Sequence, residues 1–113
     1  MNYLKSILSL GMIFLLCSCT SIYDVTKIPR TPDNVKAVRE CQRTAATAVG
    51  YSQEGFWKLK EGCYRTLDNT IFQRVPEYPN SIPGCQLIDD WGEGNWKNFY
   101  FLCEPDAEGK IKP

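Results

Sequence analysis

Residues 85–103 read CQLIDDWGEGNWKNFYFLC, two segments rich in aromatic and aliphatic residues on either side of the sequence GEGN. Two such segments around a glycine-rich connection are typical of a β-hairpin. If the pairing is centred on Gly94, Cys85 lies opposite Cys103 and Leu87 lies opposite Phe101. The stretch therefore predicts a C-terminal β-hairpin that a disulfide between Cys85 and Cys103 can close.

The same pairing divides the side chains of the hairpin between two faces, because successive residues of a strand point to opposite sides. The expected core face carries Cys85, Leu87, Trp91, Phe99 and Phe101, and the expected outer face carries Gln86, Ile88, Asp90, Asn98, Tyr100 and Leu102. Asp89 falls on the core face, where the pairing offers no reason for a carboxylate. We expect Trp91 to be buried and Trp96, at the turn, to be accessible.

Two segments upstream of the hairpin have the three- and four-residue spacing of amphipathic helices. The first, residues 33–49, places Cys41 on its apolar stripe, and the second, residues 53–74, places Cys63 on its own stripe. Thr31 or Asp33 can cap the first helix, Gly50 suits its end, and Pro76 limits the second helix.

The helix cysteines are placed to pair with each other. The midpoint between Cys41 and Cys63 coincides with the middle of the connection at residues 50–55, so both cysteines lie at the same height if the helices fold back. Packed helices leave roughly 4–5 Å between facing Cα atoms, which a disulfide can bridge. A zinc site with four thiolates is the alternative, but the cysteine spacing lacks paired Cys-x-x-Cys motifs. We expect an α+β domain over residues 33–105, a stapled helical hairpin packed on the stapled β-hairpin, followed by a flexible tail at 106–113.

The N-terminal residues have the features of an export signal: Lys5 precedes an apolar run too short to span a bilayer comfortably. At the end of this run, Leu16-Cys17-Ser18-Cys19 resembles the lipobox of bacterial lipoproteins, in which an aliphatic and a small residue precede the acylated cysteine. Cys19 follows the small Ser18, whereas Cys17 follows the large Leu16 and would leave with the signal. An ordinary secretory signal with incidental cysteines is the alternative.

The lipobox resemblance implies a signal peptide over residues 1–18 and acyl chains, such as palmitate, on Cys19. In lipoproteins of two-membrane bacteria, an aspartate directly after the acylated cysteine resembles an inner-membrane retention signal. Thr20 stands at that position here, so the resemblance implies an outer-membrane anchor, with the domain expected to face the periplasm. Residues 19–32 contain two prolines and no sustained period, and we expect them to form a tether between lipid and domain.

The composition excludes several kinds of function. The 113-residue chain has 13 basic and 13 acidic residues, without a basic block that would indicate nucleic acid. It has no histidine, which removes Ser-His-Asp and Cys-His catalysis and the commonest zinc ligand. Asp89, Asp90 and Glu93 lack the spacing of a calcium loop, so a solvated turn is favoured there over a cation site. We expect no enzyme activity, no cofactor and no metal.

Four residues are candidates for contact with a partner. Trp96 and Tyr100 could stack on a sugar or anchor a protein, whereas aromatic residues that merely fill the core are the simpler interpretation. Arg43 and Arg65, in the related fragments CQRT and CYRT, could flank an anion or lie in solvent.

The sequence therefore predicts a non-enzymatic binding or structural module of the outer membrane. It would contact membrane lipid through acylated Cys19 and an envelope protein or glycan through its domain. The alternative is a phage- or plasmid-type inhibitor or exclusion lipoprotein that blocks a receptor or a cell-wall hydrolase.

Overall fold

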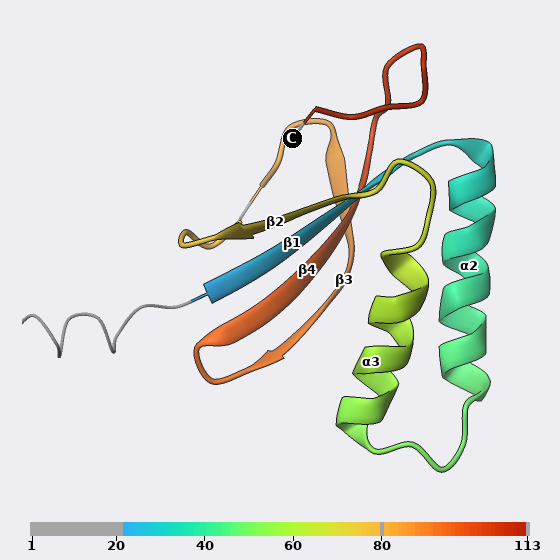
Figure 1. Ribbon diagram of the computed structural model, residues 1–113, viewed down its shortest axis with the longest axis vertical. Helices are drawn as coiled ribbons and strands as arrows, with labels where there is room; N and C mark the ends of the chain where they lie inside the picture. Colours follow the sequence, from blue (N-terminus) through green and yellow to red (C-terminus); the bar gives the residue numbers. More distant parts are fainter. Residues whose placement is uncertain (1–21, 80, 113) are drawn as a thin grey trace, which may run out of the picture.

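A computed structural model describes residues 22–79 and 81–112 and contains two helices and a four-stranded sheet (Figure 1). The elements in chain order are β1 (Ile22–Pro29), α2 (Pro32–Thr47), α3 (Gln53–Tyr64), β2 (Ile71–Val75), β3 (Cys85–Glu93) and β4 (Trp96–Cys103). This is the α+β class that the sequence predicts. The predicted signal peptide and Cys19 lie outside the described residues.

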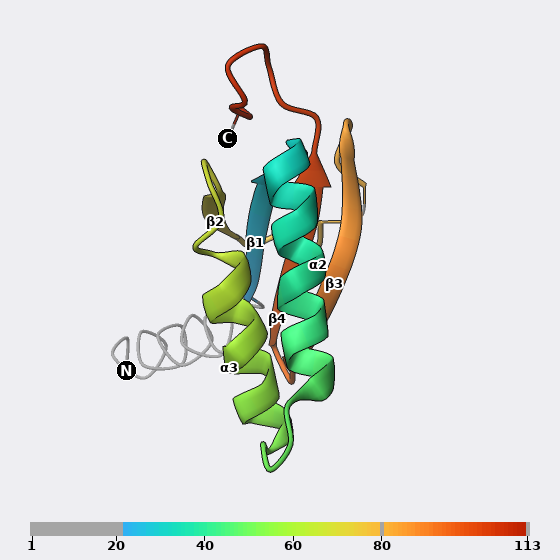
Figure 2. The ribbon, with the colours of Figure 1, turned by 90° about the vertical axis from the view of Figure 1, so that its right-hand side faces the viewer.

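The sheet has the strand order β2-β1-β4-β3. Its two central strands, β1 and β4, run parallel, and each edge strand pairs antiparallel with its central neighbour. The helices connect β1 to β2 and cover one face of the sheet (Figure 2). Neither helix is long and apolar enough to cross a membrane within the part of the chain that is described.

The strand β1 is the largest departure from the sequence expectation. A tether was expected over residues 19–32, but Ile22–Pro29 forms a central strand, and α2 follows it from Pro32. Polar residues interrupt the continuous apolar run that a central strand covered on both faces usually shows. Asp24 and Thr26 are buried among the helix-facing residues, with 4% and 0% of their surface exposed. The folded domain therefore includes residues 22–32, which were expected to belong to the tether.

The second helix also differs from the expectation, because it ends at Tyr64 instead of continuing to residue 74. A turn follows, in which Asn69 adopts a left-handed backbone conformation (φ 58°) that asparagine tolerates better than most residues. Ile71–Val75 then pairs with β1 as the edge strand β2. The residues whose apolar spacing suggested a helix there belong instead to a strand that pairs with β1. Sequence periodicity does not reveal this pairing.

The N-cap and the disulfide of the helical hairpin are as predicted. Thr31 caps α2, since its side chain accepts a hydrogen bond from the backbone N–H of Asn34. Cys41 and Cys63 form a disulfide with their Cα atoms 5.7 Å apart. Cys85 and Cys103 form the second disulfide, with a Cα separation of 4.0 Å. Both expected pairings are confirmed.

The β-hairpin contains a bulge that the sequence analysis did not predict. Cys85 pairs with Cys103 and Leu87 with Phe101 as expected, but the register then shifts, and Asp89 pairs with Tyr100. The shift transfers Asp89 and Trp91 to the face that the helices cover, because one extra residue inverts the alternation of side chains. The expectation that Trp91 shares a face with Leu87 is wrong, whereas its predicted burial is confirmed.

The turn of the hairpin requires a glycine before it. A Cβ atom on Gly92 would collide with the backbone carbonyl oxygen of Trp96, so a larger residue would force the two strands apart. Gly94 takes the positive φ of 62° that the tight connection needs.

The sheet has a core on each face. The helix side is filled by a cluster of Ile28, Val38, Cys41, Tyr64, Trp91, Tyr100 and Leu102. The opposite side holds Val25, Phe99, Phe101 and Cys103, covered by side chains that include Ile82 and Ile111. Residues 106–112, expected to belong to a flexible tail, form a turn around Asp106 and bring Ile111 against this second core. Leu87 was expected in the core but is 47% exposed.

Candidate functional site: a groove lined by tryptophans

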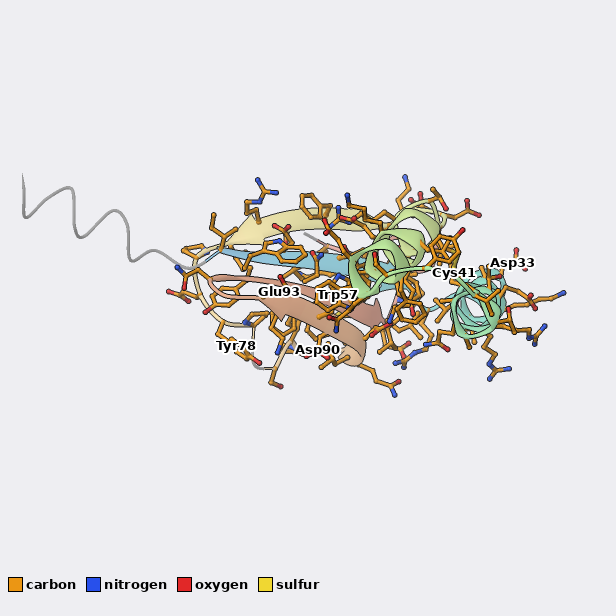
Figure 3. The ribbon with its side chains drawn as sticks, turned by 90° about the horizontal axis from the view of Figure 1, so that it is seen from below. Asp33, Cys41, Trp57, Tyr78, Asp90 and Glu93 are labelled. Atoms are coloured by element: carbon orange, nitrogen blue, oxygen red, sulfur yellow. A yellow bond between two sulfur atoms is a disulfide. The ribbon has the colours of Figure 1, made fainter. Side chains whose placement is uncertain are left out.

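All three tryptophans of the chain line one groove between α3 and the end of the β-hairpin. The groove has a volume of about 470 Å³, and its other lining side chains are Glu54, Lys58, Glu61 and Glu93. Figure 3 shows Trp57 on α3 next to the end of the hairpin that carries Glu93. The groove thus combines aromatic surfaces with charged groups at its rim.

Trp91 forms the buried wall of this groove, and the bulge in β3 is what turns it toward α3. Its ring stacks on Tyr100, with ring centroids 4.6 Å apart, and lies nearly parallel to the ring of Trp57, at 6.4 Å. The ammonium group of Lys60 lies 4.7 Å from the centroid of the Trp91 ring. These contacts hold Trp91 in one orientation, with only 6% of its surface exposed.

Trp96 is held by a hydrogen bond to a buried carboxylate. Its indole Nε1 donates to Oδ2 of Asp24 at 3.1 Å, and Arg74 Nε donates to Oδ1 of the same carboxylate at 2.8 Å. Burial alone would raise the pKa of Asp24, but the hydrogen bonds from Arg74 and Trp96 outweigh it, so the pKa lies below its ordinary value. Asp24 therefore stays ionised and fixes the ring of Trp96, which is 37% exposed.

The rim of the groove carries more carboxylates than ammonium groups. Glu54 pairs with Lys58 at 3.5 Å, one turn further along α3. Glu61 pairs with Arg65, at the end of the same helix. Glu93 adds an exposed carboxylate from the end of β3.

Below the groove, a polar cluster joins the helix to the sheet. Asp89 accepts hydrogen bonds from Lys60 Nζ at 2.9 Å and from the Tyr64 hydroxyl at 3.0 Å. Burial first, and the negative charge of Asp89 second, raise the pKa of Tyr64, so its hydroxyl stays protonated. The carboxylate that was unexplained on the predicted core face is therefore a structural acceptor for α3.

The sequence-predicted contact residues do not form one site. Tyr100, expected on the outer face, is fully buried beneath α3 and cannot meet a partner at the surface. Arg43 is exposed on α2 and pairs with Glu40. Arg65 instead reaches the sheet, where it donates to Asn98 Oδ1 at 3.2 Å, so the two arginines serve different partners. Of the four, only Trp96 lines the groove.

The three acidic residues near the hairpin turn are also separated. Asp89 binds Lys60 and Tyr64, whereas Asp90 pairs with Lys97 at 3.2 Å. Within residues 22–79 and 81–112, no group of three or more carboxylate or cysteine side chains is placed to hold a metal ion.

Comparisons with protein-family models, curated proteins and solved structures found no match. The interpretation of the groove therefore depends on its own geometry. Trp57 and Trp91 were not assigned to a binding surface from the sequence, because a helix residue and a strand residue far apart in the chain meet only in the fold.

Proposed function

We propose that the protein is an outer-membrane lipoprotein, anchored through Cys19, whose domain binds an envelope component in the tryptophan groove. The observation that carries the binding role is the convergence of Trp57, Trp91 and Trp96 on one open groove. Indole rings offer a large contact area at low cost in conformational entropy, and they are enriched among residues that dominate binding energy.

The groove is prepared for binding rather than for chemistry. Its walls are held by the Trp91–Tyr100 stack and by the Asp24–Trp96 hydrogen bond, so these side chains lose little conformational entropy when a ligand binds. Among the described residues, the lining consists of indole rings, carboxylates and one ammonium group, and two of the three carboxylates, Glu54 and Glu61, are engaged in ion pairs with Lys58 and Arg65. This lining favours a non-enzymatic module.

The lipobox at residues 16–19 and the two disulfides support the location. Disulfides persist in oxidising compartments such as the periplasm, and a domain of this size gains needed stability from them. An acylated Cys19 would keep such a domain at the membrane surface.

Site-specific photocrosslinking in intact cells tests the proposal. A benzophenone side chain replaces Lys58 at the rim of the groove, and a matched control carries it at Lys36, which is exposed on α2 outside the groove. We expect a distinct crosslinked product from position 58 that is absent from position 36, and we expect Trp96→Ala to reduce it. Identical products from both positions would refute the groove as the binding site. Capture of a receptor or a cell-wall hydrolase would support the inhibitor alternative.

A further inference from the structure

The start of β1 places the folded domain very close to the lipidation site. We propose that the domain rests directly on the membrane, with the end of the sheet that carries Ile22, Tyr78 and Trp96 against the lipid headgroups. This inference rests on the acylation of Cys19 in the proposed function and goes beyond it, because it assigns a membrane-contacting surface and an orientation.

The length of the connection limits where the domain can lie. Ile22 already belongs to the sheet, since its backbone N–H donates to the carbonyl oxygen of Asn95 at 2.8 Å. Only two residues separate Cys19 from Ile22. Even fully extended, three residue steps span at most about 11 Å, which is less than the radius of gyration of about 12 Å for a domain of this size. The end of the sheet at Ile22 must therefore stay near the bilayer.

The same end presents apolar and aromatic side chains to solvent. Ile22 is 43% exposed, Trp96 is 37% exposed and Tyr78 is 49% exposed. Ile22 pairs directly with Trp96 in the sheet, and Tyr78 packs edge-on against Tyr23 with ring centroids 5.4 Å apart. The three exposed side chains thus surround the beginning of β1. Tryptophan and tyrosine are the residues that favour the headgroup region of a bilayer.

The arrangement of the elements is consistent with this orientation. In Figure 1, the start of β1, the end of β2 and the β3–β4 connection lie at one end of the sheet, away from α2. The groove opens between this end and α3, so a ligand would be met beside the membrane surface.

Charge does not explain the contact as well as aromatic insertion does. Around Tyr78 and Trp96, the described charged side chains include the exposed Glu93 and the partly buried Lys97, and Lys97 is paired with Asp90. Arg74, which shares the Asp24 carboxylate with Trp96, is paired with that carboxylate. The charges here are therefore of both signs and do not form a basic cluster that would bind anionic lipids. The membrane contact should therefore persist at high salt, which screens interactions between exposed charges.

The test uses the natively acylated protein in nanodiscs of phosphatidylethanolamine and phosphatidylglycerol that carry a nitroxide on the lipid headgroup. Paramagnetic broadening is read from the amide signals of Ile22 and Trp96, with Ala45 on α2 as the internal reference. We expect strong broadening at Ile22 and Trp96, little at Ala45, and the same pattern at high salt. Equal broadening at all three positions, or none, would overturn the proposed orientation.

A fluorescence measurement provides an independent check on the surface. The headgroup nitroxide should quench wild-type tryptophan fluorescence, and Trp96→Phe should lose most of this quenching while the matched variant Trp57→Phe keeps it. Equal quenching of the two variants would overturn the proposal. Mass spectrometry of the purified protein comes first: a chain without acyl groups would refute the anchor itself, whereas an acylated chain in which Trp96→Phe and Trp57→Phe are quenched equally would refute only the docking.

Discussion

Replacement of Trp91 by alanine should strongly destabilise the domain, because the bulge in β3 places this ring at the centre of the helix–sheet interface. Trp91 is 6% exposed and stacks on Tyr100 and Trp57. Truncation of a buried aromatic residue to alanine costs about 3–5 kcal/mol of the free energy of unfolding. Small domains have a total stability of roughly 5–15 kcal/mol, so Trp91→Ala should remove a large fraction of it.

Leu87→Ala is the matched control, because an uninterrupted hairpin would place Leu87 on the same face as Trp91. In the structure Leu87 lies before the bulge and is 47% exposed, whereas a buried leucine would lose about 2–5 kcal/mol on truncation. We expect Leu87→Ala to cost less than about 1 kcal/mol, as surface substitutions usually do.

Urea denaturation followed by far-ultraviolet circular dichroism measures both variants, since this signal does not depend on the tryptophan that is removed. The midpoint and the slope together give the free energy of unfolding. A cost for Leu87→Ala equal to or above that for Trp91→Ala would refute the register shift between Leu87 and Asp89.

Three further predictions follow from the carboxylate that holds Trp96, from the disulfides and from the lipobox. The pKa of Asp24 in the folded state lies below its ordinary value of 3.8. The stabilising contribution of this carboxylate is therefore complete above about pH 4 and is lost as the pH falls through the folded-state pKa. The difference in free energy of unfolding between wild type and Asp24→Asn should be constant from neutral to mildly acidic pH and shrink below about pH 4. A constant difference down to strongly acidic pH would contradict this. Removal of either disulfide, by Cys41→Ser with Cys63→Ser or by the corresponding hairpin pair, should lower the free energy of unfolding by about 3 kcal/mol in urea denaturation, because each bridge closes a loop of similar length. A bridge between a helix cysteine and a hairpin cysteine in non-reducing peptide mapping would show that the layout is wrong. Cys19→Ser should leave an unprocessed chain without acyl groups by mass spectrometry, and lipid on the substituted chain would exclude Cys19 as the acylation site.

The local features of this protein could be predicted from the sequence. The apolar stripes around Cys41 and Cys63 predict two helices, and the symmetric spacing of each cysteine pair about its turn predicts both disulfides. Such features depend on residues close together in the chain, where periodicity and turn geometry constrain the backbone directly. The lipobox at Cys19 is local in the same sense, and it predicts an anchor without describing the domain.

Tertiary structure alone decided the remaining features, because they depend on contacts between distant segments. The strand β1 contains buried polar residues, and only its pairing with β2 and β4 and the partners of Asp24 and Thr26 make it a strand. The bulge in β3 is favoured because it brings Asp89 to Lys60 and Tyr64 while Trp91 packs on Tyr100. The groove forms only where α3 packs beside the hairpin, because its tryptophans come from separate elements. The local sequence of neither element predicts this shared surface.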